Sequence, residues 1–95
     1  MPLETTPYDS AEYLDTAEAV AAYIDEAFQT GDAGFIAHAL GVAARARGMT
    51  QIAKAAGLSR ESLYRALGDH GNPEFSTVLR VAKALGLRLA VEAAE

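Results

Sequence analysis

The sequence contains no cysteine, no tryptophan and no long apolar run. Without cysteine the chain has no disulfide bond, no thiolate nucleophile and no cysteine-type metal site. No apolar stretch approaches the roughly 18 residues of a membrane-spanning helix. The first ten residues, MPLETTPYDS, lack the charged-then-apolar layout of a signal peptide. We therefore expect a cytoplasmic protein that does not enter a membrane.

Patterns that would indicate catalysis or cofactor binding are missing as well. His38 and His70 have no second ligand at metal-binding spacing, and neither belongs to an HExxH pattern. The sequence has no phosphate-binding glycine-rich loop after a strand and no GxSxG. General acid–base catalysis needs carboxylates in a pocket that shifts their pKa values, whereas those of the N-terminal half fall on predicted exposed helix faces. We expect no enzymatic activity, no metal and no other cofactor.

Lysine and arginine are absent from residues 1–44, which contain eight carboxylates and therefore carry a charge of −8. Residues 45–95 hold all eight basic residues and five acidic ones, and residues 45–65 alone carry +4. The total charge of −5 thus hides a basic segment suited to a polyanion and an acidic segment suited to a cationic partner. Solubility alone is the other explanation of the acidic segment.

The chain of 95 residues is short enough for a single domain, residues 1–95. We divide it into an acidic N-terminal arm and helix (1–31), a helix-turn-helix core (32–86) and a C-terminal strand or tail (87–95). Alanine supplies much of the 51% hydrophobic content, so the core should be thin. Because a monomer of this size buries only about two-thirds of its unfolded surface, a second copy or a partner would add stability.

Residues 50–67, TQIAKAAGLSRESLYRAL, predict two short helices joined by a tight turn. Thr50 is the expected N-cap of the first helix, and Gly57 the left-handed residue at its end. Ser59 caps the second helix, which runs to Leu67 before Gly68. The small Ala53 lets the two helices approach closely, and the angle between them is filled by Ile52, Leu58 and Leu63. This spacing is typical of a helix-turn-helix, whose second helix enters a DNA major groove; a generic helical hairpin is the plainer alternative.

A helical wheel gives the second helix two faces. Leu63, Ala66 and Leu67 share one face, and the other consists of Arg60, Glu61, Tyr64 and Arg65. Arginine and tyrosine side chains can reach base edges and phosphates. The alternative is a solvated face on which Glu61 and Arg65 form an ordinary i,i+4 pair.

Three further helices and one strand are expected. Thr16 caps a helix that runs to about Thr30, Asp32 starts a helix over residues 33–47, and Asn72-Pro73 starts one that Gly86 ends. Their periodicity directs the apolar residues inward, including Phe28, Phe35, Phe75 and Leu79. The alternation in Leu87–Val91 predicts a short strand. Arg45 and Arg47 complement the dipole of their helix, and facing a DNA backbone is the alternative.

The sequence resembles the HigA-like group of addiction-module antidote proteins. MTQIAKAAGLSRESLYRALG and GNPEFSTVLRVAKALGLRL carry the resemblance, and SAEYLDTAEAVAAYIDEAF extends it over nearly the whole chain. Those proteins are antitoxins with a repressor-like (XRE, lambda-repressor type) helix-turn-helix. The resemblance implies an all-α fold of about five helices, a small basic toxin partner of the RelE/ParE/HigB-like kind, and repression of the protein's own operon.

The resemblance also assigns candidate residues. Base-reading positions fall on Arg60, Glu61, Tyr64 and Arg65, and DNA-backbone positions on Thr50, Gln51, Lys54 and Ser59. Glu61 departs from the frequent glutamine; it can accept from a cytosine N4 amine or orient Arg65. Charge and resemblance together indicate which residues contact the toxin: Glu12, Asp15, Glu18, Asp25 and Glu26.

Specific recognition of double-stranded operator DNA needs two copies of one helix-turn-helix, so we expect a homodimer. Leu87–Val91 is the leading candidate for part of its interface, because strand pairing would supply hydrogen-bond partners; pairing with a partner protein's sheet edge, or an interface on the Phe75 helix, is the alternative. A stand-alone XRE-type repressor without a toxin partner is the alternative function.

Overall fold

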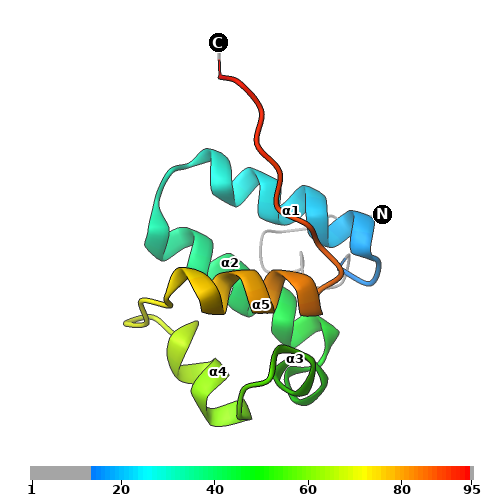
Figure 1. Ribbon diagram of the computed structural model, residues 1–95, viewed down its shortest axis with the longest axis vertical. Coiled ribbons are helices and arrows are strands. Elements are labelled where there is room, and N and C mark those ends of the chain that lie inside the picture. Colours follow the sequence, from blue (N-terminus) through cyan, green and yellow to red (C-terminus); the bar gives the residue numbers. More distant parts are fainter. Residues whose placement is uncertain (1–13, 95) are drawn as a thin grey trace, which may run out of the picture.

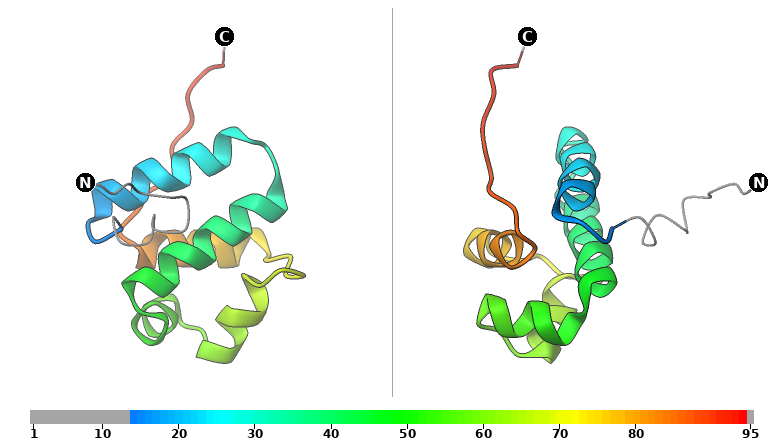
Figure 2. Two further views of the ribbon diagram at one scale, coloured as in Figure 1. Left: turned by 180° about the vertical axis from the view of Figure 1, so that it is seen from behind. Right: turned by 90° about the vertical axis from the view of Figure 1, so that its right-hand side faces the viewer.

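The computed structural model describes residues 14–94, which form five α-helices and no strand (Figure 1). The helices are α1 (Ala17–Gln29), α2 (Ala33–Arg47), α3 (Met49–Ala56), α4 (Arg60–Ala66) and α5 (Phe75–Ala84). Helix α1 lies at one end of the molecule and α3 and α4 at the other, with α2 and α5 between them (Figures 1 and 2). The all-helical class predicted from the sequence is confirmed.

The core consists of small and medium-sized side chains. The largest fully buried ones are Val20, Leu40, Leu63 and Val81, which come from α1, α2, α4 and α5. Alanines from α2 and α3 complete the core and let the helices approach closely. Gly41 of α2 has the same effect, because a Cβ there would stand only 3.2 Å from the Leu67 carbonyl oxygen.

The N-terminal helix begins where its cap predicts. The Thr16 hydroxyl accepts a hydrogen bond from the Ala19 N–H at 3.1 Å, which satisfies one of the free donors of the first turn. The helix ends at Gln29, one residue before the predicted end, and Gly31 follows with a φ of +69°. The sequence also predicts a single helical turn over residues 11–14, capped by Asp9 or Ser10; of these residues only Leu14 is among those described.

Gly48 is the only residue between α2 and α3. Asp32 caps α2, since its carboxylate accepts hydrogen bonds from the N–H groups of Gly34 and Phe35, and the helix ends at Arg47 as predicted. The prediction of Thr50 as the N-cap of the next helix is wrong. Gly48, with a φ of +107°, turns the chain within one residue, so Met49 already belongs to α3 and Thr50 is its second residue.

The connection between α3 and α4 matches the prediction closely. Gly57 has a left-handed conformation (φ +74°); its N–H donates to the Lys54 carbonyl and the Leu58 N–H to the Ala53 carbonyl. These two bonds close the end of α3 in a Schellman motif. The Ser59 hydroxyl then accepts from the Ser62 N–H at 2.9 Å and caps α4. Helix α4 ends at Ala66, one residue short of the prediction.

The predicted start of α5 at Asn72-Pro73 is wrong. The helix begins at Phe75 after Glu74, and Asn72 and Pro73 lie in an extended segment. The preceding loop folds tightly back on α4, since a Cβ on Gly71 would overlap the Ala66 carbonyl. The chain therefore needs residues 72–74 to cross from the end of α4 to the start of α5.

The predicted strand at Leu87–Val91 is not supported. After α5, Gly86 (φ +84°) donates to the Lys83 carbonyl and Leu87 to the Ala82 carbonyl, again a Schellman motif. Leu87 packs against the core, but residues 87–94 have no regular structure and leave the helices as an extended segment (Figure 1). No strand among residues 14–94 offers them a hydrogen-bonding partner, and Val91 is 98% exposed.

Four apolar side chains that the periodicity directs inward are exposed to solvent. The exposed fractions are 38% for Phe28, 47% for Phe35, 68% for Phe75 and 43% for Leu79. Helical periodicity identifies the apolar side of a helix, but a small helical body covers only part of that side. The placement of these four residues in the core was therefore wrong.

Candidate functional site

Helix α4 is fixed to the domain by one face and exposes the other. Leu63 is fully buried and Leu67 is nearly so, while Ser59 holds the first turn through the Ser62 N–H. The four predicted base-reading residues all lie on the exposed face: Arg60, Glu61, Tyr64 and Arg65. The structure thus brings this predicted set together on one side of one short helix.

Arg60 and Tyr64 form a pair on this face. The guanidinium carbon of Arg60 lies 5.4 Å from the centre of the Tyr64 ring, within the range of a cation–π interaction. Nη2 of Arg60 lies 3.4 Å from the Tyr64 hydroxyl oxygen, to which it donates a long hydrogen bond. The pairing limits the conformations of a long side chain before any ligand binds, and so lowers the entropy loss on binding.

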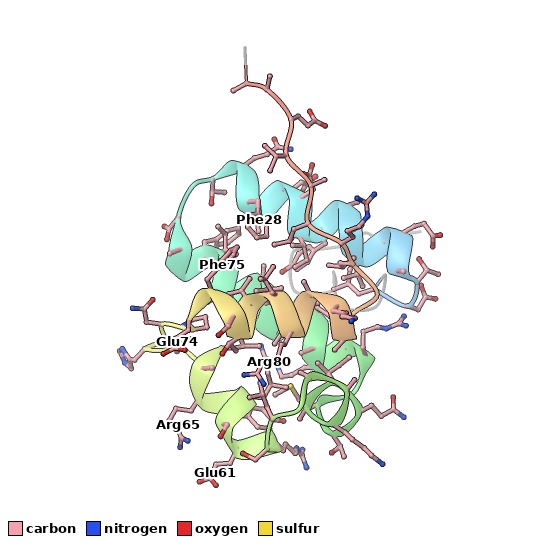
Figure 3. All side chains as sticks on the ribbon, in the orientation of Figure 1. Phe28, Glu61, Arg65, Glu74, Phe75 and Arg80 are labelled. Carbon is pink, nitrogen blue, oxygen red and sulfur yellow. The ribbon has the colours of Figure 1, made fainter. Side chains whose placement is uncertain are left out.

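Glu61 and Arg65 occupy the same exposed face. Figure 3 shows both side chains projecting from α4 away from the other helices. Neither residue is buried, so both are free to contact a large ligand. A carboxylate and a guanidinium one turn apart give this face both a hydrogen-bond acceptor and a multiple donor.

The predicted backbone-contacting residues extend this surface onto α3. Thr50, Gln51 and Lys54 are all exposed on α3, and Ser59 is exposed at the turn into α4. The Gln51 side chain folds back toward Gly48, with its Oε1 3.6 Å from where a Cβ would stand on that glycine. The hydroxyl of Ser59 caps α4 by accepting from the Ser62 N–H, so Ser59 serves mainly to hold the first turn of α4 in place.

Arg80 of α5 belongs beside this surface, although the sequence did not indicate it. Its Nη1 lies 3.7 Å from where a Cβ would stand on Gly57, at the turn between α3 and α4. Figure 3 shows the side chain projecting from α5 toward those two helices. Arg80 and Lys83 also border a shallow depression together with Ala55 and Ala56 of α3. The i,i+3 spacing of Arg80 and Lys83 places both cations on one side of α5. Because α5 is far from α3 along the chain, the sequence does not show that this side faces α3.

The acidic residues assigned to a protein partner lie at the opposite end of the molecule. Helix α1 buries Val20 and Ile24, and its exposed surface carries Glu18, Asp25 and Glu26, with Asp15 exposed just before it. Asp25 accepts a hydrogen bond from the Gln29 amide at 2.9 Å. Glu12 lies outside the described residues. Figure 1 shows α1 and α4 at opposite ends of the molecule, so the acidic surface of α1 is separate from the exposed face of α4.

Comparison with known proteins identifies relatives along nearly the whole chain. A family model described as a probable addiction module antidote protein matches residues 4–93. An uncharacterized protein of Haemophilus influenzae strain Rd is 48% identical over 85 residues, which cover 90% of this chain and 88% of the relative. No solved structure matches the chain significantly. No helix among residues 14–94 is long and apolar enough to cross a membrane.

Proposed function

The chain belongs to the family of probable addiction module antidote proteins, and we propose that it is the antitoxin of a type II toxin–antitoxin module. It neutralises a small basic toxin of the RelE/ParE/HigB-like kind by direct binding. It also represses its own operon through a repressor-like XRE helix-turn-helix formed by α3 and α4. It has no catalytic activity of its own, and it acts in the cytoplasm, where operator and toxin are found.

The observation that supports this proposal most strongly is the separation of charge between the two ends of the molecule. Helix α1 itself carries only carboxylates among its charged side chains, with Arg88 of the C-terminal segment following Gly86 beside its first turn, whereas α3 and α4 carry Lys54, Arg60 and Arg65 against Glu61 alone. A protein with one ligand does not need two oppositely charged surfaces. A cationic toxin and a polyanionic operator would account for both.

The dimensions of α4 fit the DNA part of the proposal. An α-helix with its side chains is about 10–12 Å across, and the major groove of B-DNA is about 12 Å wide, so the seven-residue helix α4 can enter it. In this mode Arg65 reads a guanine, Glu61 accepts from a cytosine amine, and Tyr64 holds Arg60 against the helix. Lys54 and Arg80 flank α4 on α3 and α5, where cations would meet phosphates.

One short helix contacts too few base pairs for useful specificity. We therefore propose that two copies bind as a homodimer to half-sites about one helical turn, or roughly 34 Å, apart. The operator would then be a palindrome related by the same two-fold axis as the protein.

The toxin part of the proposal rests on α1. An RNA-cleaving toxin must present cationic groups to phosphates, and a helix with exposed Glu18, Asp25 and Glu26 is complementary to such groups. The buried side of α1 packs on its own domain through Val20 and Ile24, so the carboxylates are available without unfolding.

Two assays on the wild-type chain test the proposal. The first asks whether a small basic reading frame adjoins its gene, co-expresses the chain with the product of that frame and measures growth, which should be restored if that product is toxic. The second measures binding to the promoter DNA upstream of its own gene by gel shift. Promoter binding without any toxin neutralisation would favour the stand-alone repressor, and failure of both would refute the proposal.

A further inference from the structure

An apolar groove opens between the end of α1, the start of α2 and the start of α5. It has a volume of about 170 Å³ and is lined mainly by Phe28, Ala33, Ile36, Phe75 and Val78. Figure 3 shows Phe28 and Phe75 close to each other on the same side of the molecule. A cavity of about 150 Å³ lined by aliphatic and aromatic groups holds a benzene molecule, so this groove accepts one ring or branched aliphatic side chain.

The residue at the edge of this groove is unusually exposed for its type. Phe75 keeps 68% of its surface in contact with solvent. Exposing so much apolar surface is unfavourable in a free protein, and such residues are typical of the central contacts of protein interfaces. Phe28 and Phe75 come from helices far apart in sequence, so the fold assembles the groove from separate segments.

The charges around the groove indicate what kind of partner covers it. Phe28 lies one turn beyond Asp25 on α1, which makes the groove continuous with the acidic surface of that helix. Glu74 is exposed directly before Phe75, and its side chain makes no capping hydrogen bond. Residues 14–44 contribute no lysine or arginine to this region. A cationic surface therefore fits, with one apolar side chain at its centre.

A second copy of this chain fits less well. In a two-fold symmetric contact the same surface meets itself, so Glu74 and the α1 carboxylates of one copy would face those of the other. Like charges brought together in this way repel each other and weaken such a contact.

We propose that this groove is the anchoring site for the basic toxin, an inference that rests on the proposed function. An apolar side chain of the toxin inserts between Phe28 and Phe75, while neighbouring lysines or arginines contact Glu74 and the carboxylates of α1. The carboxylates accelerate association, and the buried side chain slows dissociation. Affinity thus depends on a short apolar contact at the end of a longer charged one.

The test measures binding of the neighbouring reading frame's basic product to immobilised full-length variants by surface plasmon resonance. Phe75→Ser removes the exposed ring and should weaken binding by about 30-fold or more, mainly through faster dissociation. Ala33→Leu fills the groove from its exposed rim and should also weaken binding, without removing any apolar group. Matched controls are Phe35→Ser and Leu79→Ser, which alter exposed apolar residues outside the groove and should change affinity less than threefold.

Thermal unfolding and promoter binding of each variant establish that the fold is intact. If the wild type does not bind the basic product at all, the antitoxin function itself is refuted. If the wild type binds but Phe75→Ser and Ala33→Leu bind equally well, only the groove assignment is overturned. Sedimentation of Phe75→Ser covers the remaining outcome: loss of a dimer with toxin binding unchanged would identify the groove as a contact between copies, which also overturns the inference.

Discussion

Gly57 should be the glycine whose replacement by alanine most directly tests how α3 is joined to α4. Its φ of +74° lies in the left-handed region, which is unfavourable for residues with a Cβ by about 1–2 kcal/mol. Space does not add to this penalty, because the nearest atom to an added Cβ is Arg80 Nη1 at 3.7 Å, an ordinary contact distance. We therefore expect Gly57→Ala to lower the free energy of unfolding by the backbone term alone, and Tm by roughly 5–10 °C.

Circular dichroism during heating and in urea would measure this change. Gly57→Asn should lose less stability than Gly57→Ala, because asparagine tolerates the left-handed conformation better. Gly31→Ala is the matched control, since Gly31 has a φ of +69° and nothing within 4 Å of an added Cβ. It should therefore be destabilised by a similar amount. If Gly57→Ala lowered the free energy of unfolding and Gly31→Ala did not, the backbone argument would be refuted, and the contact with Arg80 would be the cause instead.

Three predictions concern the two proposed ligands. Arg65→Ala should lose about 1–3 kcal/mol of operator affinity while stability and toxin binding persist; equal operator affinity in titrations would exclude base reading by Arg65. Lys54→Ala should weaken binding to all DNA sequences alike and reduce the slope of log affinity against log salt, and an unchanged slope would argue against a phosphate contact. Replacing Glu18, Asp25 and Glu26 together by lysine should leave helicity and operator binding nearly intact but slow toxin association at low salt in stopped-flow mixing. An unchanged association rate would mean that the carboxylates of α1 serve only solubility.

Local signals predicted correctly those helix ends that depend on a single capping side chain or on a glycine just after the helix. Thr16, Asp32 and Ser59 cap helices through their own side chains, and Gly57 and Gly86 end helices in left-handed conformations, as the sequence indicates. These interactions lie within a few residues of each other along the chain. They therefore depend little on how the rest of the molecule packs.

The misplaced helix starts depend on connections between elements. Thr50 and Asn72 are good capping residues, but neither caps a helix. Helix α3 starts earlier, directly after Gly48, and α5 starts later, directly after Glu74, because the position of each helix in the fold decides where it begins. A capping side chain is only a local preference, which tertiary packing overrides. The strand prediction failed for a related reason, since alternation in Leu87–Val91 provides no hydrogen-bonding partner.

The candidate surfaces were predicted in part. The exposed face of α4 follows from periodicity, because Leu63 and Leu67 define the buried face and the polar residues must lie opposite. Arg80 was missed because only the packing of α5 on α3 brings it to the turn at Gly57. The groove at Phe28 and Phe75 was missed because the pattern places both rings in the core, and only three-dimensional packing leaves them uncovered.

The single residue between α2 and α3 has a consequence for how the chain folds. The first three connections, residues 30–32, Gly48 and residues 57–59, are all short, so α1 to α4 meet with little loss of loop entropy. The longer loop at residues 67–74 separates these helices from α5, which packs mainly on α3 and also on α2. Contacts that are close in sequence form fastest, so we expect rapid folding in which α5 closes the structure. We therefore expect newly synthesised molecules to reach the folded state soon after synthesis.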